Sequence, residues 1–337
     1  MAKKRIAVFT ATGCRVCESV LLDLHYTVNP LTRWADIVFW PYVSGNSRDE
    51  LEKLDGVDVC FFAGAVRTEA DRRAASKLRE KSEIVTALGA CAAFGGMPGL
   101  ANLGMVEGEE KEESSPLSSD SFPPPLPGRE PCVRALPQVV ETDYFIAGCP
   151  PTPPLTWAAV QSLLGGEDRQ NILAFATSRL PGNVAEAVAS GALPPRGTVF
   201  AGEKAVCASC SRIKEKKRFK ELRKSRDRDA DPSRCLLEQG VFCQGIVTRE
   251  GCGGLCTAAG VPCRGCFGKA EAVYDPGARM VSAVASVFET LDPLEVEKIV
   301  DDFDDLAGTL YRYTLPSQCV LRCPPPLEGR EGATCKP

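Results

Sequence analysis

Residues 5–18, RIAVFTATGCRVCE, join a short apolar run to a pair of cysteines. The run at 5–10 ends in small residues, which is typical of a strand buried on both faces of a parallel sheet. Similar runs recur at residues 36–40, 57–64, 83–88 and 143–148. Helical patterns with a charged outer face, such as residues 66–81, lie between these runs. The alternation predicts an α/β fold with a doubly wound parallel sheet.

The overall composition is that of an ordinary globular protein: 337 residues, 44% hydrophobic and 25% charged, with room for two domains. The formal net charge of −4 gives no general attraction to nucleic acid or anionic membranes. The basic start precedes only a short apolar run, so we expect a strand and no signal peptide. Residues 84–106 are uncharged and long enough for a transmembrane helix, but five glycines and Pro98 favour a buried loop. We expect a cytoplasmic protein without a membrane span.

Cysteine is abundant, with 17 residues against a single histidine. In a reducing cytoplasm disulfides are not expected, and dense cysteines indicate metal. In open α/β sheets, ligands bind outside the carboxyl ends of the strands. Four cysteines follow predicted strands and should converge there: Cys14, Cys17, Cys91 and Cys149. Four thiolates around one point suit a 4Fe-4S cluster or zinc. Cys60 lies inside a predicted strand, so we expect a small buried apolar residue.

Eight further cysteines lie in the second half, among few helix or strand signals. They are Cys207, Cys210, Cys235, Cys243, Cys252, Cys256, Cys263 and Cys266. Eight thiols are enough for two more four-ligand sites, and we expect this region to fold around its metals. The stretch at 251–266, GCGGLCTAAGVPCRGC, also holds five glycines, which we expect to make room for an object wider than a side chain.

The chain resembles the small subunits of nickel–iron hydrogenases over residues 5–290. The resemblance rests on GCRVCE (13–18), LGACAAFGGMPGLANL (88–103), AGCPPTPPL (147–155), CLLEQGVFCQG (235–245) and GCGGLCTAAGVPCRGCFG (251–268). Within that family it most resembles the methyl-viologen-reducing hydrogenases of methanogens and relatives, which feed electrons to heterodisulfide reductase. The resemblance implies a flavodoxin-like sheet that carries one iron–sulfur cluster. A smaller, irregular and α-helical C-terminal region would be built around two further clusters.

The resemblance also implies three 4Fe-4S clusters in a line. The proximal cluster, nearest the catalytic centre, would be held by Cys14, Cys17, Cys91 and Cys149. The middle cluster would be held by Cys252, Cys256, Cys263 and Cys266, and the distal one by Cys207, Cys210, Cys235 and Cys243. Many respiratory relatives carry proline at the position of Cys256, and their middle cluster has three irons.

The nickel–iron centre of such enzymes belongs to a separate large subunit, so the resemblance implies no catalytic residue of this chain's own. The chain would carry electrons one at a time between that subunit and an acceptor. The acceptor would be an iron–sulfur or flavin subunit, such as one linked to heterodisulfide reductase. Its identity, the direction of electron flow and the stoichiometry of the complex stay open.

Three residues beside the first cysteine pair need separate interpretation. Glu18 matches an acidic residue common in this subgroup, and either a proton relay or an acidic cap on the following helix would explain it. Arg15 and Val16 depart from the family, which usually has small residues there, often glycine. Because this loop faces the catalytic subunit, a bulky cation would alter the partner surface and could raise the proximal potential. It leaves open whether the partner contains nickel and iron.

We expect the chain to divide into four parts. They are a flavodoxin-like proximal-cluster domain at 1–165 with a low-complexity insert at 107–131, a connector at 166–200, a two-cluster domain at 201–290, and a C-terminal helix and irregular tail at 291–337. Amphipathic patterns predict helices at 278–289 and 293–313, the second starting near Pro293. Two other features stay open. Residues 211–234, with eleven Lys or Arg, form either a solvated arm or a docking surface, and Cys319, Cys323 and Cys335 are either free thiols or part of a metal site.

Three functional interpretations follow. The first is a hydrogenase electron-transfer subunit, and the second is a related relay whose partner lacks a nickel–iron centre and does not activate hydrogen. The third is a zinc-stabilised binding module. The dispersed first set of cysteines and the lack of ligand histidines argue against zinc fingers. Nickel in the partner would separate the first two interpretations.

Overall fold

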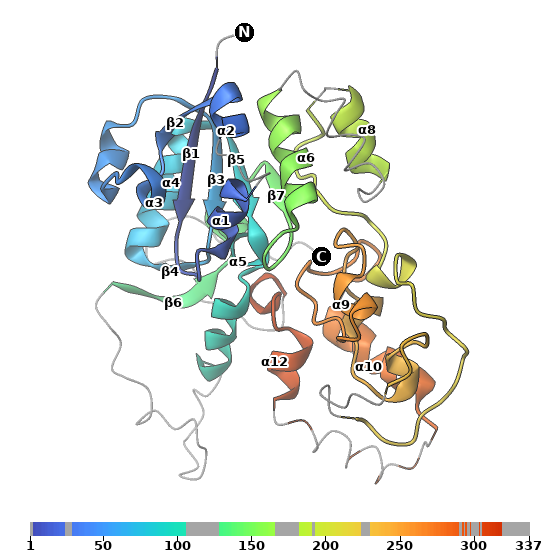
Figure 1. The fold of residues 1–337 in the computed structure, drawn as a ribbon. Coiled ribbons are helices and arrows are strands. Elements are labelled where there is room, and N and C mark those ends of the chain that lie inside the picture. Colours follow the sequence, from blue (N-terminus) through green and yellow to red (C-terminus); the bar gives the residue numbers. More distant parts are fainter. Residues whose placement is uncertain are drawn as a thin grey trace.

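A computed structural model gives the fold of the protein (Figure 1). It describes residues 3–23, 29–105, 128–165, 182–190, 193–223, 230–289, 292, 294, 297, 303 and 305–318. The first half is an α/β sheet with helices on both faces, and the second half consists of short helices and turns (Figure 1).

Five parallel strands form the central sheet in the order β2-β1-β3-β5-β7. Their bounds are β1 (Lys4–Thr10), β2 (Ala35–Phe39), β3 (Val57–Ala63), β5 (Ser82–Leu88) and β7 (Tyr144–Ile146). Each strand overlaps one of the predicted apolar runs, so the predicted parallel α/β sheet is confirmed. Counted within the sheet, the order is 2-1-3-4-5, which is that of flavodoxin-like doubly wound sheets.

Both faces of the sheet are buried, because alternate residues of each strand enter different cores. Ile6 and Val8 of β1 belong to one core, while Ala7 and Phe9 belong to the other. Cys60 of β3 is fully buried in the second core, which confirms its interpretation as a small apolar residue. Continuous burial on both faces explains why the strand sequences are apolar runs without alternation.

Seven helices are described in the first half and the connector. They are α1 (Val16–Leu22), α2 (Asn29–Trp34), α3 (Pro41–Ser44), α4 (Glu69–Lys81), α5 (Gly89–Phe94), α6 (Pro153–Leu164) and α8 (Gly182–Ser190). The 3₁₀ turns η2 (Arg48–Lys53), η3 (Met97–Met105) and η5 (Leu136–Gln138) supplement them. Helix α6 contributes to the first core and α4 to the second, so helices cover both faces of the sheet.

The predicted helix at 66–81 starts too early. Residues Val66–Thr68 form strand β4, which pairs antiparallel with β6 (Arg129–Arg134), and α4 begins at Glu69. A capping box sets this boundary: the Thr68 hydroxyl accepts from the Asp71 backbone N–H, and the Asp71 carboxylate accepts from that of Thr68, each over 3.1 Å. Most of the low-complexity insert lies outside the described residues, but its last residues enter β6.

The expected buried loop at 84–106 is wrong beyond residue 88, where the predicted strand, β5, ends. The described residues after it form α5 and η3. Gly95, with φ 94°, ends α5 in the left-handed conformation, so this glycine separates two helical segments instead of abolishing them. Among the described residues, no helix is both long and apolar enough to cross a membrane.

The second half has a small core of its own. Its elements are η6 (Val206–Ala208), η7 (Leu237–Gln239), η8 (Gln244–Ile246), α9 (Leu255–Ala258), α10 (Pro276–Val287), α12 (Leu306–Leu310) and η9 (Leu315–Ser317). Two cysteines, Cys243 and Cys263, belong to this core together with apolar residues such as Met280. Helix α10 confirms the prediction at 278–289, and the Asp275 carboxylate caps it by accepting from the Ala278 N–H over 2.9 Å.

The helix predicted at 293–313 is described only in part. Helix α12 covers Leu306–Leu310, the chain turns from residue 311, and Pro293 lies outside the described residues. In Figure 1, α12 lies between the sheet and the region of α9 and α10. The segment after it reaches back to the first half: the Tyr313 carbonyl accepts from the Gly96 N–H over 3.1 Å, and the Pro316 carbonyl from Gln138 Nε2 over 2.6 Å.

Candidate metal centres

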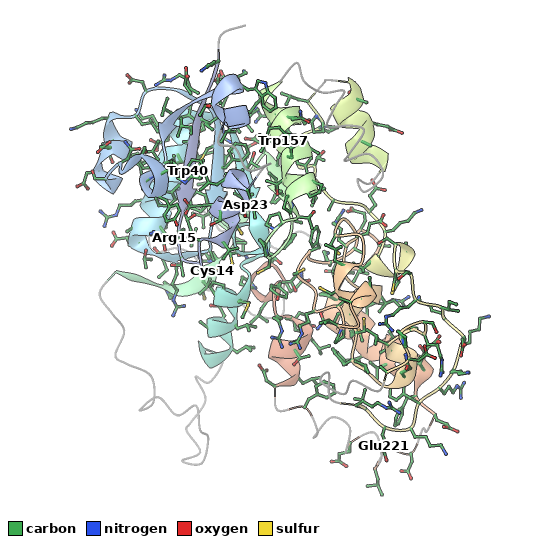
Figure 2. All side chains as sticks on the ribbon, viewed as in Figure 1. Cys14, Arg15, Asp23, Trp40, Trp157 and Glu221 are labelled. Atoms are coloured by element: carbon green, nitrogen blue, oxygen red, sulfur yellow. The ribbon has the colours of Figure 1, made fainter. Side chains whose placement is uncertain are left out.

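The four cysteines expected at the carboxyl edge of the sheet do meet there. Cys14 lies in the loop after β1, Cys17 on α1, Cys91 on α5 and Cys149 between β7 and α6. Because β1, β5 and β7 are parallel, all of these loops leave the sheet at the same edge. Figure 2 labels Cys14 at this edge.

The thiols of this proximal set act on one another electrostatically. Burial raises the pKa of Cys17 far above its usual value, with further contributions from Cys91, Cys149 and Cys14. Burial also raises the pKa of Cys91 to about 12, aided by Cys149 and Cys14, and the pKa of Cys149 is shifted upward in the same way by burial and Cys14. All six pairs of the set therefore interact. Ionised thiolates this close together would repel one another, and a positively charged group among them would relieve that repulsion.

The backbone around the proximal set is shaped to admit its sulfur atoms. A Cβ on Gly89 would lie 2.3 Å from Cys17 Sγ, and a Cβ on Gly96 would lie 2.5 Å from Cys91 Sγ. Both glycines have positive φ, so neither position suits another residue type. The backbone N–H of Met97 donates a hydrogen bond to Cys91, the kind of contact that stabilises a metal-bound thiolate. These residues fit a four-thiolate metal centre.

The four cysteines of the expected distal set line one hollow. They are Cys207, Cys210, Cys235 and Cys243. Arg212 and Lys214 from the basic segment at 211–234 line it as well, which places that segment beside this set. A Cβ on Gly245 would lie 3.3 Å from Cys207 Sγ and 3.7 Å from Cys243 Sγ. The hollow and its donors fit a cluster with four thiolate ligands.

The four cysteines of the expected middle set also interact. Burial raises the pKa of Cys266 to about 12, with contributions from Cys263, Cys252 and Cys256. The pKa of Cys263 is raised mainly by burial, and hydrogen bonds from the Thr248 side chain and the Gly265 backbone oppose that rise. These donors would stabilise thiolate ligands, so the set fits a metal centre.

The glycines between these cysteines are needed for their backbone conformation more than for the absence of a side chain. All five have positive φ: Gly251, Gly253, Gly254, Gly260 and Gly265. A Cβ on Gly253 would meet nothing within 4 Å, whereas one on Gly265 would lie 2.8 Å from Gln244 Oε1. Left-handed turns that wrap the chain around its thiols explain this composition better than room for a wide object.

The three cysteine sets are connected one after another by contacts in space. The backbone N–H of Cys149, from the proximal set, donates a hydrogen bond to Cys266 of the middle set. The backbone N–H of Cys263, from the middle set, donates to Cys243 Sγ of the distal set over 3.3 Å. The Tyr313 phenol, whose pKa is raised to about 12 by burial and then by Cys149 and Cys266, lies near the first of these contacts. The order is therefore proximal, middle, distal.

No three His, Cys, Asp or Glu side chains within the described ranges come close enough to hold a single metal ion. A four-iron cluster is a larger object than an ion, with one thiolate at each iron corner.

Glu18 faces inward. It is buried, and its Oε2 accepts a hydrogen bond from Trp40 Nε1 over 2.6 Å. Glu18 is the acidic residue in the first turn of helix α1, so the interpretation as an acidic cap on this helix also stays open. The buried carboxylate lies beside the proximal set, since it contributes to the raised pKa of Cys17. The proton-relay role remains a hypothesis.

Comparison with known proteins identifies the family. Residues 14–163 match the family model described as "NADH ubiquinone oxidoreductase, 20 Kd subunit". A subunit of the "F420-non-reducing hydrogenase vhu" of Methanocaldococcus jannaschii is 33% identical over 94% of this chain and 97% of its own length. The chain belongs to the family of hydrogenase small subunits. The resemblance stated from its cysteine motifs is thus confirmed.

One further relative of this hydrogenase small subunit agrees, and a solved structure is also similar. The "F420-non-reducing hydrogenase iron-sulfur subunit" of Archaeoglobus profundus is 30% identical over 94% of this chain and 97% of its own. Among solved structures, the [NiFeSe] hydrogenase of Desulfovibrio vulgaris Hildenborough aligns with 79% of this chain and 94% of its own, at 19% identity and a TM-score of 0.47. The named relatives belong to hydrogenases, which are oxidoreductases.

Sequence reasoning missed several neighbours of the cysteines in this small subunit. Trp40, Thr248 and Tyr313 all contact or approach a cysteine set or its buried carboxylate. Trp40 ends an apolar run and gave no separate signal, and Tyr313 lies at the end of the helix predicted at 293–313, whose pattern does not indicate a contact with a cysteine set. Cys319, Cys323 and Cys335 lie outside the described residues.

Proposed function

We propose that the chain is the iron–sulfur electron-transfer subunit of a nickel–iron hydrogenase complex. It relays electrons one at a time, through three 4Fe-4S clusters, between a catalytic large subunit and an acceptor protein. The observation that carries this proposal is the grouping of twelve cysteines into three sets of four, joined in series by two backbone-to-sulfur hydrogen bonds. The iron–sulfur name of the Archaeoglobus relative supports the cofactor type.

In this proposal the cysteines are the ligands of each cluster. The proximal ligands are Cys14, Cys17, Cys91 and Cys149; the middle ligands are Cys252, Cys256, Cys263 and Cys266; the distal ligands are Cys207, Cys210, Cys235 and Cys243. When bound, such a cluster supplies a site that accepts and releases one electron. The chain surrounds most of these thiols with buried side chains and aims backbone N–H groups at them, which limits water and stabilises the thiolates.

The two ends of the series suit different partners. At the proximal end Cys14 is exposed, and the nearby side chains of Val16 and Met97 are 44% and 49% exposed. We propose that the large subunit covers this apolar edge. At the distal end, basic residues stand beside the hollow, and we propose that the acceptor, such as a heterodisulfide-reductase-linked subunit, docks there.

We also propose the division at 1–165, 166–200, 201–290 and 291–337 as the domain organisation. Two cores built on the sheet and a third core in the second half support it. The first core crosses this division, because it includes Phe200, Ala201 and Phe267.

The test is anaerobic purification of the complex with its partners. A tag on this chain is expected to retrieve a catalytic subunit that contains nickel and iron. A partner without nickel would favour the related relay that does not activate hydrogen. A colourless chain with zinc and no partner would contradict the proposed function.

A further inference from the structure

Arg15 is one of two non-glycine residues with positive φ among the described residues, and Lys216 is the other. Its φ of 65° and ψ of 0° place it in the left-handed region. That conformation brings Cβ close to the backbone and costs about 1 kcal/mol or more. Strain of this kind persists where the surroundings or the function require it, so each of the two residues needs a cause.

The cause at Lys216 lies within the chain. The backbone N–H groups of Glu215 and Lys216 donate to the carboxylate of Glu238 over 2.7 and 3.0 Å. Glu238 is itself buried, so this carboxylate fixes the turn. Arg15 has less support, since its carbonyl accepts from the Glu18 N–H over 3.0 Å but no described side chain fixes its turn. Its side chain is exposed, helix α1 has no side-chain cap there, and no described carboxylate pairs with its guanidinium.

The surface around Arg15 is partly apolar. Cys14 and Val16 flank it and are exposed, and Met97 is another exposed apolar side chain next to the proximal loops. Figure 2 labels Cys14 and Arg15 near one another at this end of the molecule. If a protein covers this patch, the guanidinium loses water and needs a partner of opposite charge, because an unpaired buried cation is strongly unfavourable.

The alternative role for Arg15 is to stabilise the thiolates of the proximal set. The Arg15 side chain is exposed, and the described contacts include no hydrogen bond from its guanidinium to a cysteine. It is therefore free to meet a group outside this chain.

We propose that Arg15 is a docking residue that forms a bidentate ion pair with a carboxylate of the catalytic subunit. This inference rests on the proposed function, which places that subunit on the proximal edge. The planar guanidinium presents paired N–H donors that match the two oxygens of a carboxylate. The left-handed backbone would set the direction in which the side chain leaves the loop, so that the guanidinium is preorganised for binding.

The test compares Arg15→Gly with Lys216→Gly in the anaerobically purified complex with its catalytic partner. Both changes remove the same kind of backbone strain, so neither should lower the melting temperature of the complex through the fold of this chain. Only Arg15→Gly should weaken assembly, raising the dissociation constant about thirtyfold, as expected when one partner of a buried charge pair is truncated. The readout is dissociation of the complex on dilution, followed by size-exclusion chromatography.

Arg15→Lys keeps the positive charge but loses the paired N–H donors of the guanidinium. The dissociation constant of its complex should therefore fall between those of the wild type and Arg15→Gly. Its amine can also be coupled to a neighbouring carboxylate by a zero-length carbodiimide. A cross-link from position 15 to a carboxylate of the catalytic subunit supports the proposal. Cross-links only within this chain, or none while the complex stays assembled, would contradict it.

Two outcomes separate this inference from the proposed function. If the wild-type chain does not associate with a catalytic subunit at all, the proposed function fails. If the wild type associates and Arg15→Gly assembles equally well, only the docking role of Arg15 is overturned. A shift in the proximal electron paramagnetic resonance signal of Arg15→Gly, without weaker assembly, would also overturn it, because the residue would then act on the cluster.

Discussion

The backbone N–H of Cys263 donates a hydrogen bond to Cys243 Sγ over 3.3 Å. These two cysteines belong to different sets, and burial together with the other's charge raises the pKa of Cys243 to about 12. The two sets are therefore in direct contact through a peptide group. With the similar bond from Cys149 to Cys266, this contact connects the three sets in one series.

Substitution of Cys256 tests whether the middle set holds a four-iron cluster. It is exposed, and the proposal makes it the ligand of one iron corner. Cys256→Pro leaves Cys252, Cys263 and Cys266, which are enough for a three-iron cluster, as the resemblance to respiratory relatives implies. The oxidised variant should show a three-iron electron paramagnetic resonance signal that the wild type lacks. If the wild type already shows that signal stoichiometrically, or the variant keeps four irons at this site, Cys256 is not a ligand.

Gly89 tests how closely the backbone must approach the proximal thiols. In Gly89→Ala the new Cβ would lie 2.3 Å from Cys17 Sγ, and the φ of 84° adds strain. We expect loss of about four irons per chain, because the proximal ligand is displaced.

Gly45→Ala is the matched control. Gly45 has a similar φ of 71°, but its Cβ would meet nothing within 4 Å. It should lose about 1 kcal/mol of stability through backbone strain and keep its iron. Equal iron content in the two alanine variants would show that the contact between Gly89 and Cys17 does not matter for cluster binding.

The basic segment at 211–234 tests where the acceptor docks. Two of its residues, Arg212 and Lys214, line the distal hollow. The described residues of the segment are mostly exposed. Reversal of charge at Lys216, Lys217 and Arg218 should slow electron transfer to an acidic acceptor, and added salt should slow the wild type in the same direction. Stopped-flow measurement of acceptor reduction gives both rates. Charge reversal at Lys3, Lys53 and Arg73, in the half of the chain that forms the sheet, is the control and should have little effect on the rate. Unchanged rates in both triple variants would show that the segment at 211–234 is a solvated arm and not a docking surface.

Cys60 tests the distinction between structural and ligand cysteines. It is fully buried, and burial raises its pKa to about 12 from an ordinary value of 9.0. The neutral thiol is therefore favoured in the fold, and the stability it contributes is present below pH 9 and is lost as the pH rises toward 12. Cys60→Ala should keep full iron content, remove that pH dependence and cost about 1 kcal/mol at neutral pH. Loss of four irons in this variant would contradict a purely structural role.

The sequence predicts the sheet well because its strands are buried on both faces, so each one is a short apolar run such as residues 57–63. The meeting of Cys14, Cys91 and Cys149 was also predictable, because parallel strands bring their carboxyl ends to one edge. Strand β4 could not be predicted, since its partner β6 follows a low-complexity segment and its end depends on the capping box of Thr68 and Asp71.

Contacts between distant parts of the chain were beyond prediction for a related reason. The bond from Gly96 to Tyr313 joins residues more than two hundred positions apart, and the amphipathic pattern at 293–313 does not indicate its partner. Likewise, the indole of Trp40, in the loop after β2, reaches Glu18 on helix α1, and neither residue's sequence context indicates the pairing. Local patterns specify elements, whereas these contacts depend on how the elements pack.

The most direct test of the account is the iron and acid-labile sulfide content of the anaerobically purified, fully loaded complex, corrected for the metals of its partners. Three four-iron clusters predict about twelve irons and twelve sulfides per chain. A reproducible value of about eight or fewer, or substantial zinc in their place, would contradict the assignment of three 4Fe-4S clusters to the twelve cysteines.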